Sequence, residues 1–311
     1  MQRVAALLAV AVLASSGCAP SRAGDPFTAV ATVYPLAWVI GEIAPHAEVV
    51  SLAAQGQDPH DQELSPQQRG LLERADLVAY VGDIGFQPQV EAAVDQAGGA
   101  VVSVVDVVGH EAMRELGDGH DDEEGAHDGE AGRAEDGAID PHFWFDARLM
   151  AKVATAVGEN AAEADPANAT AYRDAARDVT AEMESLAGDI EQLLRSCRHD
   201  HVIVSHEAYG YLLEPHGLEQ EGISGADGHS EASPADIARL AAEIRERQLP
   251  AVLTEPVEGR TDAEVVAREA GVDLVEIYSL DIVDAEQADK ALPQLLREQA
   301  DAVVQAAACG P

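Results

Sequence analysis

Short apolar runs alternate with segments of helical periodicity along most of the chain. The runs are rich in Val, Ile and Leu, which is typical of strands buried on both faces of a sheet. Eight runs predict strands, at residues 27–33, 48–54, 76–82, 100–108, 201–205, 218–224, 251–255 and 272–279. Helices are predicted between and after them, at 34–44, from 66 on, and at 86–97, 207–216, 234–248, 261–270 and 285–308. A strand–helix alternation of this kind predicts parallel sheets.

Helical periodicity also fills the middle of the chain, from Asp146 to about Ser196, with an interruption at Asp165-Pro166. The part after Pro166 is some thirty residues long, roughly 45 Å as a helix, which is more than one lobe needs. We therefore predict an α/β protein of two lobes, each with a four-stranded parallel sheet flanked by helices. The expected division is an N-terminal lobe at 27–160, a long connecting backbone helix at 161–196 and a C-terminal lobe at 197–311.

One segment of the first lobe, residues 109–140, breaks the alternation. It holds twelve Asp or Glu against two Arg, many glycines, and three histidines, His110, His120 and His127. Such a composition cannot bury a core, so we expect the segment to be mobile.

The first residues are typical of a signal peptide, assigned to 1–17. Arg3 is followed by an apolar run, Val4 to Ala14, that is too short to span a bilayer. Cys18 follows small residues, as at the cleavage site of a bacterial lipoprotein, and would carry the lipid on a tether at 18–26. Ser15 departs from the Leu usual in that pattern, and a plain secreted protein cut nearby is the alternative. We expect an extracytoplasmic protein, anchored to the outer face of the cytoplasmic membrane or periplasmic.

The net charge of the chain narrows the classes of molecule that it can bind. The formal net charge of −38 makes nucleic acid a poor partner and attracts cations, although acidic surfaces also keep secreted proteins soluble.

Two cysteines besides Cys18 remain, Cys197 and Cys309. In an oxidising compartment they are candidates for a disulfide that pins the last helix to its lobe, with two buried thiols as the alternative.

Four side chains with metal-ligating chemistry follow predicted strands directly or after a loop. They are His60, His142, His206 and Asp281. Ligands bind beyond the carboxyl ends of strands in open α/β sheets, and a cleft between lobes would bring two residues from each lobe together. Three imidazoles and one carboxylate suit tetrahedral Zn²⁺, whereas a set richer in carboxylates favours manganese.

The first two histidines also share a backbone frame. Asp58-Pro59-His60 returns as Asp140-Pro141-His142, and proline holds each frame stiff and non-helical. For each residue taken alone, an ordinary role in a loop or a helix cap is the competing interpretation.

Four segments together resemble a known family. They are QDPHDQELSPQQRGLLERADLVAYVG, DPHFWFDA, SHEAYGYLLEPHGLEQEGISG and AVLTEPVEGRTDAEVVAREAGVDLVEIYSLD. In this combination the chain resembles, over nearly its whole mature length, the solute-binding proteins of bacterial zinc and manganese ABC transporters, of the ZnuA and TroA type.

The resemblance implies His60, His142 and His206 as metal ligands. Manganese-selective members tend to carry glutamate at the third position, so His206 favours Zn²⁺ as the transported ligand. The fourth ligand varies in the family between a carboxylate and water, and the motif YSLDIVD departs from the usual ending. We align Asp281 there, with Asp284 as the other register.

The acidic segment resembles that of zinc-specific members, which implies accessory metal capture by His110, His120 and His127. A solvated linker with no such role is the alternative. The expected partners are an ABC permease, the membrane through the lipid anchor and, in addition, an extracytoplasmic zinc chaperone. We expect a monomer.

Three other functions compete with zinc uptake: manganese or iron binding, metal-dependent surface adhesion and zinc-dependent hydrolysis. An HExxH motif beginning at His206-Glu207 would need a second histidine where Gly210 stands. A closed set of four ligands also leaves zinc no open position for catalysis. We therefore expect no enzyme.

Overall fold

The computed structural model describes residues 26–53, 59–60, 62–116, 138–223, 232–256 and 259–310. Several predicted features lie outside these residues: the signal peptide, Cys18 with the tether up to residue 25, Asp58, His120 and His127. Among the described residues, no helix combines the length and the apolar character needed to cross a membrane.

The N-terminal lobe is built on a four-stranded sheet in which all neighbouring strands are parallel, in the order β2-β1-β3-β4. Its strands are β1 (Thr28–Ala31), β2 (Glu48–Ser51), β3 (Leu77–Tyr80) and β4 (Ala100–Ser103). Its helices are α1 (Tyr34–Ile43), α2 (Pro66–Arg74), α3 (Pro88–Val94) and α4 (Val104–Val108), with the 3₁₀ turn η1 (His110–Ala112). Ser65 caps α2 through a reciprocal capping box with Gln68, and Pro66 stands at its first position.

The C-terminal lobe repeats this topology, with a parallel sheet in the order β6-β5-β7-β8. Its strands are β5 (His201–Val204), β6 (Glu219–Gly222), β7 (Ala251–Thr254) and β8 (Asp273–Glu276). Its helical elements are α7 (Gly210–Leu213), η3 (Glu214–His216), α8 (Pro234–Arg247), α9 (Arg260–Ala270), η4 (Gln287–Asp289) and α10 (Leu292–Ala306). The two sheets confirm the predicted fold class.

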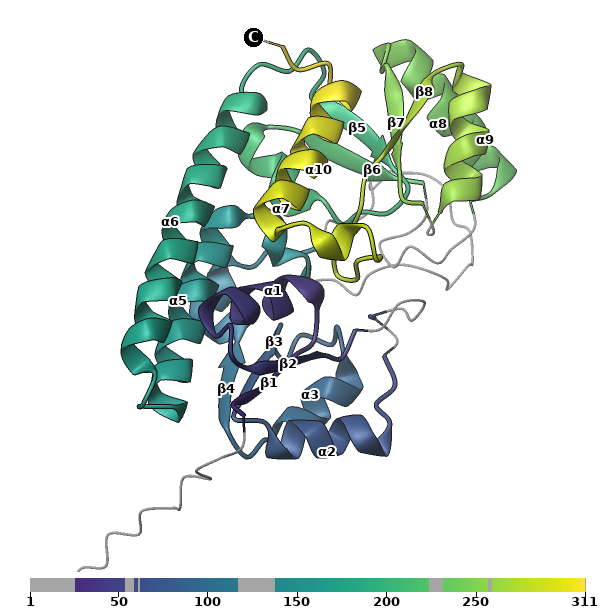
Figure 1. Ribbon diagram of the computed structural model, residues 1–311. Coiled ribbons are helices and arrows are strands. Elements are labelled where there is room, and N and C mark those ends of the chain that lie inside the picture. The colour runs from purple at the N-terminus through teal and green to yellow at the C-terminus, as the bar shows by residue number, and fades with distance from the viewer. Residues whose placement is uncertain are drawn as a thin grey trace, which may run out of the picture.

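Two long helices pack side by side: α6 (Ala169–Leu193) runs along one side of both lobes, and α5 (Ala147–Ala164) lies between it and the sheet of the N-terminal lobe (Figure 1). Helix α6 packs against α5, against α1 of the first lobe and against α10 of the second. The largest cluster of buried apolar side chains runs through this layer without a break, from Ala29 of β1 to Leu253 of β7. The lobes therefore share one core.

The prediction of a strand over 100–108 is wrong for residues 104–108, which form helix α4. Strand β4 ends at Ser103, whose side chain accepts the backbone N–H of Asp106 and caps α4. In a short Val-rich run the periodicity does not distinguish a strand from a buried helix. Here the Ser103 cap favours a helix after residue 103.

The predicted helix at 207–216 is also shorter than expected. Only α7 is α-helical there, and the turn η3 follows it at once. Pro215 explains the change, because it has no backbone N–H to donate to the carbonyl of Tyr211, the hydrogen bond that would continue the α-helix.

The two ends of the acidic segment belong to the N-terminal lobe. Glu115 pairs with Ile139 in an antiparallel bridge, and the N–H of Asp140 donates to the carbonyl of Arg114 at 2.8 Å. Residues 117–137 between these ends lie outside the described part of the chain.

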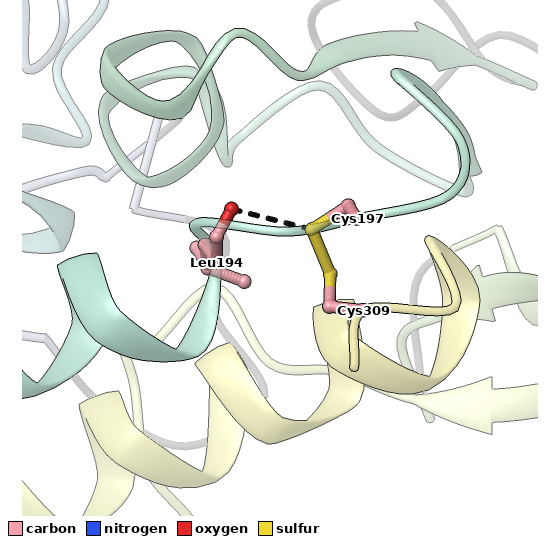
Figure 2. Close-up of a disulfide and its surroundings, with 3 residues drawn as sticks. All are labelled: Leu194, Cys197 and Cys309. Atoms are coloured by element: carbon pink, nitrogen blue, oxygen red, sulfur yellow. Dashed lines mark hydrogen bonds between the residues drawn. A yellow bond between two sulfur atoms is a disulfide. The ribbon is translucent and has the colours of Figure 1, made fainter. Parts of the chain in front are cut away.

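Figure 2 shows Cys197 and Cys309 joined as a disulfide, across 112 positions of sequence. Cys197 follows α6 and Cys309 follows α10, and the two segments also pair through backbone hydrogen bonds. The pairing ties the end of the last helix to the segment that leads into β5.

Candidate metal site

Three predicted ligands converge where the two lobes meet. His60 follows β2, His142 is the residue directly before the 3₁₀ turn η2 (Phe143–Phe145), and His206 follows β5. One ligand atom of each lies within 4.8 Å of those of the other two. The ring centroids stand 5.2 Å apart for His142 and His206, 5.7 Å for His60 and His142, and 6.2 Å for His60 and His206. His142 and His206 are buried, whereas His60 is half-buried.

The orientation of His142 is set by Asp140 of the same Asp-Pro-His frame. One carboxylate oxygen of Asp140 lies 2.7 Å from Nδ1 of His142 and also accepts the backbone N–H of His142 at 2.9 Å. A carboxylate at this position stabilises the tautomer with the proton on Nδ1, which leaves Nε2 as an electron-pair donor. Nε2 of His142 is buried and has no hydrogen-bond partner among the described residues, as expected of an atom that awaits a ligand.

His206 is held in the same way from the second lobe. Its Nδ1 lies 3.1 Å from Oε1 of Glu255, which also accepts the hydroxyl of Tyr209 at 2.8 Å. Burial alone would raise the pKa of Glu255, but the hydrogen bonds from His206 and Tyr209 outweigh it, and the pKa lies below its usual value. Glu255 is therefore a charged carboxylate that fixes the imidazole.

His60 is positioned by its neighbours in the first frame. Its ring meets Phe86 edge-on, with centroids 4.6 Å apart. The carbonyl of Pro59, one residue earlier, accepts the side-chain amide of buried Gln87 at 3.3 Å. The same amide donates to the side-chain Oε1 of Gln62 at 3.1 Å, so buried Gln87 bonds to a residue on each side of His60.

Asp281 lies beside the three imidazoles without joining the group of atoms within 4.8 Å. Its side chain is buried, which raises its pKa, and the Ser279 hydroxyl and the nearby His142 and His206 oppose that rise. The other register, Asp284, is exposed and caps the turn at η4, accepting the N–H groups of Glu286 and Gln287. The geometry thus favours Asp281 over Asp284 as a fourth ligand.

The donor set fits a tetrahedral cation. Ligands at about 2.0–2.1 Å from zinc stand roughly 3.3 Å from one another, and the three ligand atoms here lie within 4.8 Å of one another. A metal-ligating histidine commonly donates its other ring N–H to a carboxylate, as His142 and His206 do here.

Two residues of the site do not follow from the histidine pattern. Glu255 stands directly after β7, so the rule that led to His206 also applies to it. Trp144 lies two residues after His142, with ring centroids 5.3 Å apart, and its indole N–H donates across to the second lobe. Nothing in the sequence pattern indicates that bond.

A second group of potential ligands lies within the C-terminal lobe: His201, Glu221 and Glu243. Both carboxylates already contact Arg239. Burial alone would raise the pKa of Glu221, but hydrogen bonds, chiefly from His201 and Arg239, outweigh it and lower the pKa to about 2. We interpret the group as a buried ion-pair network.

Other predicted residues lie away from the cluster. His110 is exposed on η1, outside both groups of potential ligands. Glu207, considered as a general base for a hydrolase, accepts the N–H of Gly222 at 2.7 Å and is tied to the end of β6.

Comparison with known proteins places this geometry in context. The family model described as zinc-uptake complex component A, periplasmic, matches residues 29–306. The chain is 26% identical over 294 residues to the high-affinity zinc uptake system protein ZnuA of Bacillus subtilis, covering 93% of this chain and 90% of that protein. It is 25% identical over 290 residues to the manganese-binding lipoprotein MntA of Halalkalibacterium halodurans, covering 88% and 87%.

Solved structures share the fold. The periplasmic zinc-binding protein TroA from Treponema pallidum superimposes with a TM-score of 0.76 at 23% identity, covering 91% of this chain and 99% of that one. A laminin-binding adhesin from Streptococcus agalactiae gives a TM-score of 0.74 at 20% identity, covering 90% and 99%.

Proposed function

The chain belongs to the family of periplasmic zinc-uptake complex component A, and we propose that it captures Zn²⁺ between its lobes and delivers it to an ABC permease. Membership confirms the resemblance that the sequence motifs indicated, and the family is one of solute-binding proteins, not of enzymes. The observation that carries the proposal is the convergence of His60, His142 and His206, from both lobes, on one point. Asp281 is the proposed fourth ligand.

The choice of zinc rests on the ligand chemistry. Three imidazoles suit zinc better than manganese, which prefers sites richer in oxygen ligands. One relative is named for zinc and another for manganese, so the name of a relative does not decide between the metals. Manganese is the second candidate, favoured by the Asp281 carboxylate near the rings.

Delivery to a permease requires that the protein work outside the cytoplasm. The signal peptide at 1–17 and lipidation at Cys18 are part of the proposal, supported by relatives that are named lipoproteins. The zinc chaperone, the monomeric state, accessory capture by His110, His120 and His127, and an adhesion role stay predictions.

Metal content and competitive zinc affinity of the mature protein test the proposal, with manganese as a competitor. The wild-type protein should hold one tightly bound zinc and keep it against excess manganese. The double variant His60→Ala/His142→Ala should lose it. A control, His46→Ala/His199→Ala, removes two histidines that lie outside the cluster and should bind zinc like the wild type.

Two results would contradict the proposal. Tight zinc retained by His60→Ala/His142→Ala would place the site elsewhere in the chain. Manganese that displaces zinc at equal concentration would remove the zinc assignment and favour the second candidate.

A further inference from the structure

One buried residue beside the proposed site has an unfavourable backbone conformation. Leu280 has a φ of +64°, in the left-handed region, and its side chain is fully buried. Only two other non-glycine residues of the described chain have positive φ, Gln248 and Ala308, and both follow a helix end. Leucine rarely adopts this conformation, so surrounding contacts must hold it.

Those contacts come from the other lobe. The indole Nε1–H of Trp144 donates to the carbonyl of Ser279 at 2.7 Å, and the backbone N–H of Tyr34 donates to the carbonyl of Asp281 at 2.9 Å. Both donors belong to the N-terminal side of the site, and Trp144 is fully buried. The backbone on each side of Leu280 thus accepts one hydrogen bond from a residue of the other lobe.

The Asp281 carboxylate is bonded within the segment that these two hydrogen bonds hold. Its Oδ1 accepts the hydroxyl of Ser279 at 2.7 Å and the N–H of Ile282 at 3.0 Å. Because both donors belong to the same short segment, the direction of the carboxylate follows the backbone that Trp144 and Tyr34 hold.

One turn of the N-terminal lobe therefore serves two parts of the site. His142 is the N-cap residue of η2, and Trp144 is the middle residue of that turn. The imidazole is offered to the metal, and the indole, two residues later, holds the segment that carries the carboxylate.

We propose that Trp144 is a positioning residue of the metal site: its indole N–H fixes the Ser279–Asp281 segment so that the Asp281 carboxylate completes the ligand set of the three histidines. The inference rests on the proposed function and adds to it a residue that does not itself bind the ion.

The test uses the two tryptophans of the chain. Trp144→Phe keeps an aromatic ring and removes the N–H donor, and zinc affinity measured against a chelator should fall by about 10- to 100-fold, as for other residues that orient metal ligands. The matched control is Trp38→Phe, on the half-buried part of α1, which should bind zinc like the wild type.

A double-mutant cycle separates positioning from general damage. In an Asp281→Asn background, Trp144→Phe should cause no further loss, since the carboxylate it positions is gone. The same loss of affinity in both backgrounds, or none in either, would overturn the inference.

A second measurement covers the case in which Trp144→Phe does not fold. In the Trp38→Phe protein, biosynthetic replacement of the remaining tryptophan by its benzothienyl analogue puts sulfur in place of the N–H, which removes the donor and keeps nearly the size and shape of the ring. An unchanged zinc affinity would again overturn the inference. Failure of the proposed function is distinguishable, because then the wild-type protein itself holds no zinc that His60 and His142 control.

Discussion

At the scale of single residues, a carboxylate beside each of two imidazoles determines which ring nitrogen is available to a metal. Asp140 and Glu255 each bind the Nδ1 side of one histidine, which leaves the other ring nitrogen available to a cation. Asp140 is itself held on its second oxygen by Arg114, at 3.2 Å, and is almost completely buried. The proposed ligands thus depend on partners that the metal does not contact.

Asp140→Asn should weaken zinc binding by about 10- to 100-fold. The amide nitrogen of asparagine must face either His142 Nδ1–H or Arg114, and both are donors, so one contact is lost in either orientation. Competition titration with a chelator measures the change.

The control for that substitution is Asp146→Asn. Asp146 caps α5 from the same segment of chain, and asparagine is an equally good cap, so zinc affinity should not change. An Asp140→Asn protein that is folded and binds zinc like the wild type would show that the carboxylate does not position His142.

At the scale of helices and strands, the close packing of α5 on α6 forms the support shared by the lobes. Gly158 lies where the two helices approach, and a Cβ placed there would stand 2.3 Å from Cβ of Ala176. Gly188 lies on α6, where an added Cβ would meet nothing within 4 Å. The two glycines therefore provide a matched pair, one at a helix contact and one in open space.

Gly158→Ala should lower the free energy of unfolding by about 1–3 kcal/mol, because the helices must separate to admit a methyl group. Gly188→Ala should raise it by up to about 1 kcal/mol through higher helix propensity. Urea unfolding of both variants measures the difference. Equal stabilisation by the two substitutions would mean that α5 and α6 do not pack this closely.

At the scale of the whole molecule, a disulfide joins the beginning of the C-terminal lobe to its end. Cys197 and Cys309 stand 112 positions apart in sequence, and a cross-link of that span restricts a large part of the unfolded chain. The same junction contains backbone hydrogen bonds, including the N–H of Gly310 to the carbonyl of Ser196 at 3.0 Å.

Cys197→Ser/Cys309→Ser should lower the free energy of unfolding by about 2–5 kcal/mol, because the unfolded chain loses the constraint. Denaturant unfolding with and without reductant measures the effect, and reductant should change only the wild type. Three reactive thiols per unlipidated mature chain, Cys18 included, counted in denaturant without reductant, would mean that the disulfide does not form.

Much of the fold follows from local patterns. The order of strands and helices and the caps of α2 at Ser65 and of α8 at Ser233 were predictable, since each depends on residues near one another in sequence. The two parallel sheets were predictable from the alternation of strands and helices. The boundary of β4 was not predictable, because a Val-rich run suits both strand and buried helix until the Ser103 cap and the packing decide.

The sequence by itself determined which side chains stand at the carboxyl ends of strands, and so which histidines are candidate ligands. It also determined the acidic charge and the family. Only the tertiary structure decided that His60, His142 and His206 meet, that Glu255 backs one of them, and that Trp144 grips the segment of Asp281. The physical reason is that these contacts join residues from separate lobes or strands, and their geometry exists only once the shared core has brought both sheets together.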